Sequence, residues 1–203
     1  MVLTIVKVLF RRYRVELFRF FLKTFSLNDK SICDIGGIST GFETLSQFCK
    51  CVIINNDIKA RTEEGWVLIV ADGRTLPFRN GTFDIIISNA VLEHIAWGRE
   101  IFAQEIRRVT RGGIFISVPY YYAPFEPHYR LPFFQFVPEF IKRFLLFKIG
   151  LKIGGMSRNN YHEIRLFKKR ELMSLFPEAQ IKVFRVFGIP ISLIVICKKG
   201  SEL

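Results

Sequence analysis

The chain has 203 residues, half of them hydrophobic, with 30 basic against 18 acidic side chains and a formal net charge of +12. A chain of this length can bury a sizeable core, so we expect one domain over residues 1–203. No segment reaches the run of about 20 apolar residues that crossing a bilayer requires. The positive charge predicts anionic partners, either nucleic acid, acidic lipid headgroups or a phosphorylated substrate.

Residues 1–25 predict a basic amphipathic helix, because apolar side chains recur at helical spacing and basic ones lie mostly on the opposite half. One interpretation is a helix packed on a sheet with its charges in water. The other is a helix lying on an anionic membrane surface. Lys7 and the arginines that follow interrupt any hydrophobic region of a cleaved signal peptide, so we do not expect one.

A short apolar strand over residues 31–36 runs into Gly36-Gly37, and an apolar pattern at helical spacing begins at Phe42. This succession predicts a strand, a glycine turn and a helix. Such a turn directs backbone N–H groups toward a ligand, and glycine lets the backbone approach that ligand closely. The stretch therefore predicts a cradle for a nucleotide-like molecule.

Alternating strands and helical patterns continue along the chain. Further apolar strands are expected at residues 52–57, 66–72, 82–89 and 114–119. An acid about 20 residues beyond a glycine turn, at the tip of the next strand, is placed to accept hydrogen bonds from ribose hydroxyls, and Asp57 has that position. Continuous apolar strands separated by helices indicate a parallel sheet covered on both faces.

The four cysteines form no CxxC pair and fall at predicted strand positions; they are Cys33, Cys49, Cys51 and Cys197. Buried cysteine usually acts as a small hydrophobic residue. We therefore expect a reduced, cytoplasmic protein without a metal site, with peripheral association at the inner membrane face as a further interpretation.

Residues 120–165 predict a substrate-binding or lid insertion, because an aromatic segment follows the fifth strand directly and ligands of open α/β sheets bind outside the carboxyl ends of the strands. Within it, residues 138–153 predict a second basic, strongly apolar helix. That helix suits either a lipid-linked acceptor at a membrane or a lid or dimer surface. A helix over 166–176 and a closing antiparallel hairpin over 179–198 complete the pattern.

Five segments follow one another along the chain: Asp34-Ile35-Gly36-Gly37, Asp57, residues 71–84 (ADGRTLPFRNGTFD), residues 88–95 (SNAVLEHI) and residues 105–113 (EIRRVTRGG). In this order and spacing they resemble the class I S-adenosylmethionine-dependent methyltransferases of the type 11 branch. The resemblance implies an α/β, Rossmann-like doubly wound fold. Its sheet is seven-stranded and mostly parallel, with an antiparallel C-terminal hairpin.

The resemblance also implies S-adenosyl-L-methionine as cofactor and a role for each matching residue. Asp34 would meet the ammonium group, Asp57 would hold the ribose hydroxyls, and Asp72 would accept a hydrogen bond from the adenine amino group. The remaining cofactor-binding residues would be Gly36, Gly37, Ile58, Gly73, Asn89 and Ala90. For each acid the other interpretation is a turn or helix-cap role, which Asp also favours.

Methyl transfer is an in-line displacement, so the enzyme aligns the acceptor and, for a hydroxyl acceptor, takes its proton. His128 is the first candidate for that base and His94 the second. His94 could instead cap or pack the helix after the fourth strand, and His128 could brace a Pro-rich loop.

Three functions stay open at this point. The first is a methyltransferase acting on a small-molecule or lipid-linked acceptor. The second is an RNA methyltransferase, suggested by the charge, although no Asn-Pro-Pro-Tyr-like motif follows the fourth strand. The third is a non-catalytic interaction protein, because Ile38 and Thr40 stand where the family usually has glycine, and β-branched residues resist positive φ.

Overall fold

The computed structural model describes residues 2–37, 42–47, 49–56, 65–125, 132–149 and 164–198. Its strands are β1 (Ser31–Ile35), β2 (Lys50–Asn55), β3 (Trp66–Val70), β4 (Phe83–Asn89), β5 (Thr110–Pro119), β6 (Gln180–Val186) and β7 (Ile189–Lys198). Its helices are α1 (Val2–Thr24), α2 (Arg99–Val109), α3 (Glu139–Arg143) and α4 (Lys169–Leu175). Short helical turns add η1 (Glu43–Gln47), η2 (Leu92–His94), η3 (Phe134–Phe136) and the π-helical η4 (Phe144–Lys148).

All seven strands form one sheet in the order β3-β2-β1-β4-β5-β7-β6. Neighbours from β3 to β5 pair in parallel, whereas β7 is antiparallel to both β5 and β6. The predicted fold class is therefore confirmed. The strand order changes direction between β1 and β4, and in open α/β sheets the crevice at such a point is where ligands bind.

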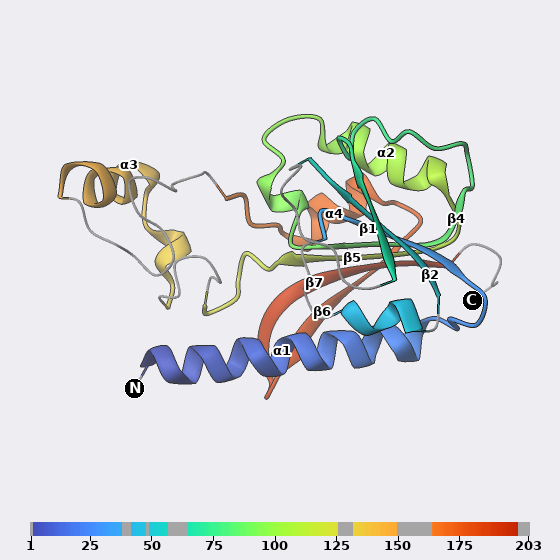
Figure 1. The fold of residues 1–203 in the computed structure, drawn as a ribbon. Coiled ribbons are helices and arrows are strands. Elements are labelled where there is room, and N and C mark those ends of the chain that lie inside the picture. Colours follow the sequence, from blue (N-terminus) through green and yellow to red (C-terminus); the bar gives the residue numbers. More distant parts are fainter. Residues whose placement is uncertain are drawn as a thin grey trace.

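The two faces of the sheet are covered by different helices (Figure 1). Ile85 and Ile87 of β4 pack into the core with α1, while Ile86 packs into the core with α2 and α4. This alternation follows from the two-residue repeat of a strand. A sheet buried on both faces needs consecutive apolar residues in its central strands, and Ile85–Ile87 of β4 supply such a run.

α1 lies along one face of the sheet, as the packing interpretation of residues 1–25 predicted (Figure 1). Its side chains Leu17 and Phe21 are fully buried there. The hydroxyl of Tyr13 lies 2.7 Å from Ser117 Oγ and donates to Ser192 Oγ at 3.2 Å, and burial raises its pKa. In the described part of the chain, the helices are too short or too polar to cross a membrane.

The cysteines agree with their predicted role. Cys33, Cys51 and Cys197 are buried strand residues, and Cys49 stands one position before β2. Burial raises the pKa of the Cys33 thiol and brings that of Cys51 to about 12, so both stay protonated and apolar at neutral pH.

Two predicted helices differ in type or length from those in the structure. The helix expected from Phe42 is the 3-10 turn η1, because buried residues three apart, such as Phe42 and Leu45, suit a helix of three residues per turn as well as an α-helix. The helix expected over 138–153 is a short α3 followed by the π-helical η4. Residues 150–153 of that prediction lie outside the described residues.

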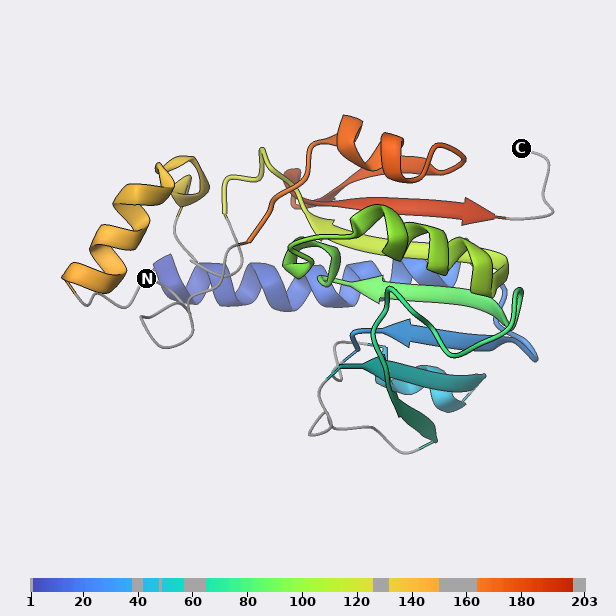
Figure 2. The ribbon, with the colours of Figure 1, turned by 90° about the horizontal axis from the view of Figure 1, so that it is seen from above.

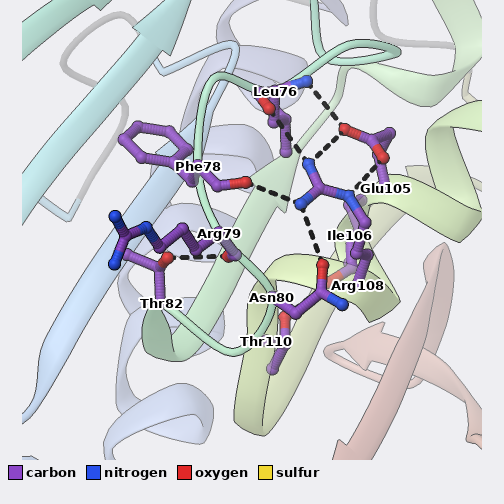
Figure 3. A network of polar contacts seen from close by, with 9 residues as sticks. All are labelled: Leu76, Phe78, Arg79, Asn80, Thr82, Glu105, Ile106, Arg108 and Thr110. Atoms are coloured by element: carbon purple, nitrogen blue, oxygen red, sulfur yellow. Dashed lines mark hydrogen bonds and ion pairs between the residues drawn. The ribbon is translucent and has the colours of Figure 1, made fainter.

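The loop between β3 and β4 is tied to α2 by one arginine (Figure 3). Arg108 donates to the carbonyl oxygens of Phe78 at 2.6 Å and Leu76 at 3.0 Å, and to both carboxylate oxygens of Glu105. Glu105 in turn accepts the backbone N–H of Leu76 at 2.8 Å. The network holds Leu76 and Phe78 of the loop against α2. It therefore restricts where the turn at Asp72, a few residues earlier in the loop, can lie.

Candidate cofactor site

A cavity of about 650 Å³ opens at the carboxyl ends of the parallel strands, where the strand order changes direction. Its wall comes from the ends of β1, β2, β3 and β4, and from the segment between β4 and α2. The lining residues are Ile35, Gly36, Ile54, Asn55, Asn56, Ala71, Asp72, Gly73, Arg74, Asn89, Ala90, Val91, His94, Ile95, Ala96, Trp97 and Phe102. A volume of this size suits a cofactor or drug-sized ligand.

The glycine turn after β1 forms one side of the cavity. Gly36 has φ +78°, and its N–H donates to the carbonyl oxygen of Ile54 at 2.6 Å. A Cβ at Gly37 would collide with the carboxylate of Asp34, which is buried just beneath it. The turn therefore needs glycine at both positions, and the Asp34 carboxylate lies directly under the backbone that faces the ligand.

The end of β4 forms the opposite side. Ala90 has φ +57°, a region that costs a residue with a side chain about 1–3 kcal/mol, and its N–H donates to Ser117 O at 2.9 Å. Ser88 Oγ donates to Ile35 O at 3.1 Å and joins the tips of β4 and β1. The backbone here is held in a strained form beside the cavity, which is common at ligand sites.

A turn after β3 brings an acid and an arginine into the wall. Arg74 donates from Nε to Asp72 Oδ1 at 3.0 Å, and its backbone N–H donates to the same oxygen at 2.8 Å. The hydrogen bond from Arg74 lowers the pKa of Asp72. Each carboxylate oxygen of Asp72 accepts two hydrogen bonds from Arg74, so a ligand donor at Asp72 would have to replace one of them.

Trp97, in the segment between β4 and α2, stacks on the guanidinium of Arg74. The guanidinium of Arg74 lies 3.8 Å from the ring centroid of Trp97, whose side chain is 66% exposed. Both side chains line the cavity, so the pair gives the site a flat, cationic wall next to Asp72. Stacking of this kind contributes about 0.5–1 kcal/mol at an exposed position.

We expect Trp97→Ala to weaken binding of S-adenosylhomocysteine about three- to tenfold, because the wall loses its aromatic face and Arg74 its stacking partner. Isothermal titration of the purified protein measures this. Trp97→Phe is the matched control and should retain most of the affinity. Equal affinity for wild type and Trp97→Ala would show that this wall does not contact the ligand.

The structure brings six of the predicted site residues to the cavity: Gly36, Asp72, Gly73, Asn89, Ala90 and His94. Asp34 and Gly37 are not among the lining residues: the Asp34 carboxylate lies beneath Gly37, on the side of the turn away from the cavity. Asp57, Ile58 and His128, together with Ile38 and Thr40, lie outside the described residues. The individual role of each residue stays a prediction.

Sequence reasoning missed Arg74 and Trp97. Arg74 had a local signal, since an arginine two residues after an aspartate in a turn can pair with it. Trp97 had none, because its stacking on Arg74 depends on how the segment after β4 folds back over the turn after β3.

The lining chemistry fits S-adenosylmethionine. Asn89 offers an amide, Trp97 offers a flat aromatic face beside the Asp72–Arg74 pair, and the glycine turn offers backbone groups at close range. Gly73 is required for packing, because a Cβ there would lie 2.6 Å from the ring of Phe102. The residues present therefore suit a ligand that carries an adenine, a ribose and a charged amino acid.

Comparison with known proteins supports the same class. Residues 34–117 match the family model of the methyltransferase domain, and every cavity-lining residue lies within that segment. No curated protein sequence matches the chain.

Solved structures share the fold at low sequence identity. A SAM-dependent methyltransferase from Methanosarcina mazei aligns with a TM-score of 0.57 and 18% identity over 89% of this chain and 96% of that one. One from Aquifex aeolicus gives 0.55 and 15% over 96% of each chain. A possible histamine N-methyltransferase from Thermotoga maritima gives 0.60 and 13% over 92% of this chain and 87% of that one.

The fold and cavity thus define a doubly wound, ligand-binding methyltransferase domain. The domain expected from the sequence is confirmed over residues 34–117, which match the model of a methyltransferase domain. The solved structures share its fold, and the cofactor expected for such a domain is S-adenosylmethionine.

Proposed function

We propose that the methyl group is transferred to a small-molecule or lipid-linked acceptor that enters from the carboxyl edge of the sheet. The observation that carries this proposal is an aromatic arm, residues 132–149, which projects beyond that edge (Figure 2). Exposed phenylalanines gather on it: Phe133, Phe136, Phe140, Phe144 and Phe147. Exposed apolar patches of this extent mark sites of interaction.

The arm is joined to the body where β5 ends. The N–H of Phe133 donates to Pro124 O at 2.8 Å, and the ring of Phe136 packs edge-on against Tyr121 at a centroid distance of 5.4 Å. Since Tyr121 follows β5 directly, these contacts support an arm that guides an acceptor toward the strand ends.

A groove of about 320 Å³ on the arm combines apolar and cationic side chains. Its lining residues are Phe140, Arg143, Phe144, Phe147 and Lys148. An amphiphilic acceptor with an anionic group, such as a lipid phosphate, has the complementary chemistry. This mixture favours a lipid-linked acceptor within the proposed class.

The bound cofactor supplies an electrophilic methyl group on a sulfonium centre. The chain positions the acceptor and, for a hydroxyl acceptor, receives its proton. His94 of η2 lines the cavity, and it is the described residue that we assign as this base.

Transfer of a labelled methyl group to a lipid extract, compared with a water-soluble extract, tests the acceptor class. We expect the double variant Phe140→Ser/Phe144→Ser to lose at least tenfold in transfer rate while S-adenosylhomocysteine binding is unchanged. Met173→Ser is the matched control, because Met173 is an exposed apolar residue of α4 outside the arm. Labelling of RNA instead of either extract would contradict the proposal.

For a hydroxyl acceptor, we expect His94→Ala to reduce the transfer rate about 10²- to 10⁴-fold, the usual contribution of a general base. Cofactor affinity should stay close to that of the wild type. A transfer rate equal to that of the wild type would show that His94 is not the general base.

A further inference from the structure

The outer face of α1 carries an apolar stripe that the packing of the helix on the sheet does not use. Leu9, Leu17 and Phe21 fill the buried side. Val8, Val15 and Leu22 are 59%, 43% and 41% exposed. They are spaced seven residues apart, so at 3.6 residues per turn they form one line along the solvent side of the helix.

Cations border this stripe on both sides. At 100° per residue, one side carries Lys7, Arg11 and Arg14. The other side carries Arg12, Arg19 and Lys23. All six are exposed, and the one acid of the helix, Glu16, bridges Arg12 at 2.6 Å and Arg19 at 3.4 Å.

An exposed aromatic residue lies next to the same face. Phe187, in the turn between β6 and β7, is 75% exposed and has φ +51°. Residues 184–187 and α1 together line a groove of about 290 Å³, to which Arg12, Arg19 and Lys23 contribute. A large aromatic side chain held in water beside basic residues is the arrangement found at membrane interfaces.

We propose that the outer face of α1, together with Phe187, binds the surface of an anionic lipid bilayer with the helix parallel to that surface. The cations would contact headgroup phosphates, and the valines, the leucine and the phenylalanine would enter the boundary of the acyl chains. A nucleic-acid backbone would use the cations and leave the apolar stripe in water, which is why we favour lipid.

This orientation bears on the aromatic arm. The start of α1 lies at the same end of the molecule as α3, in both views (Figures 1 and 2). In Figure 1, α3 lies on the sheet side of α1, so a bilayer on the outer face of α1 would share this end of the molecule with the arm without contacting α3 directly. The inference does not depend on the acceptor, because vesicle binding requires neither cofactor nor methyl transfer.

Sedimentation of the full chain with vesicles tests the proposal. The vesicles are phosphatidylcholine alone, or phosphatidylcholine with about one third phosphatidylglycerol. We expect binding to the anionic vesicles at least tenfold tighter than to the neutral ones. The triple variant Val8→Ser/Val15→Ser/Leu22→Ser should lose at least tenfold in that binding with unchanged affinity for S-adenosylhomocysteine, which also reports that it is folded.

Val67→Ser/Val70→Ser is the matched control, since these valines of the edge strand β3 are 59% and 50% exposed and lie away from α1. It should bind vesicles like the wild type. Equal binding to neutral and anionic vesicles, or full binding by the triple variant, would overturn the proposal. Binding of single-stranded RNA that Arg12→Gln/Arg19→Gln weakens, with no vesicle binding by the wild type, would assign this face to nucleic acid instead.

Discussion

Replacing Gly36 by alanine should weaken S-adenosylmethionine binding at least tenfold, which corresponds to about 1.4 kcal/mol or more of binding free energy. Gly36 lines the cavity with φ +78°, and an added Cβ would collide with the side chain of Val91 on the opposite wall. Either the glycine turn or the segment after β4 must move. Both carry groups that face the ligand, so the cavity cannot keep its shape. Isothermal titration with the cofactor measures the effect.

Gly188→Ala separates this effect from backbone strain. Gly188 has φ +77°, nearly the value at Gly36, but an added Cβ would meet nothing within 4 Å. Each variant should therefore lose about 1–2 kcal/mol of stability from the left-handed backbone, whereas only Gly36→Ala should lose cofactor affinity. Adding Val91→Ala to Gly36→Ala makes room for the new methyl group and should restore part of the affinity. Wild-type affinity in Gly36→Ala would contradict the assignment of this cavity to the cofactor.

The fold followed from the sequence because its strongest signals are local. The strand over 82–89 carries three consecutive isoleucines at 85–87, and only a sheet covered on both faces buries such a run. The glycine turn was recognisable for the same reason, since Gly36 takes a backbone conformation that other residues avoid.

The site was predictable only where it depends on strand ends. Asp72 and Asn89 could be placed because parallel strands bring their carboxyl ends to one edge. The stacking of Trp97 on Arg74 and the exposed stripe of α1 could not, since both depend on which side chains the tertiary packing leaves toward the cavity or the solvent. Sequence periodicity identified α1 as amphipathic but did not show that its outer face keeps apolar residues.

The motif of residues 71–84 was interpreted from the sequence as part of the cofactor site, and the structure gives part of it a structural role as well. Leu76 and Phe78 present their backbone carbonyls to Arg108. Asp84 accepts hydrogen bonds from Ser31 and Arg111 at the opposite, amino end of the sheet, which lowers its pKa. Residues within the motif thus fix the loop in place through contacts with neighbouring elements, in addition to any contact with the ligand.

Arg108→Ala, in α2, should therefore destabilise the protein by releasing this loop, lowering the free energy of unfolding by about 2–3 kcal/mol. The half-buried guanidinium connects Glu105 with two backbone carbonyls, and its loss leaves both carbonyls without this donor and Glu105 with only the N–H of Leu76. Urea unfolding at neutral pH measures the loss. Arg79→Ala, at an exposed arginine of the same loop, is the matched control and should change stability by less than about 0.5 kcal/mol.

The same network predicts a pH dependence with a definite sign. The hydrogen bonds from Arg108 lower the pKa of Glu105 below its ordinary 4.5. A carboxyl group with a lower pKa in the folded state stabilises the protein fully above its unfolded pKa, and this contribution is lost as the pH falls through the folded value. The stability difference between wild type and Arg108→Ala should therefore be largest at neutral pH and shrink as the pH falls below 4.5 through the folded pKa of Glu105. A difference that stays constant over this range would mean that Arg108 stabilises the loop through its carbonyl contacts alone, without its ion pair to Glu105.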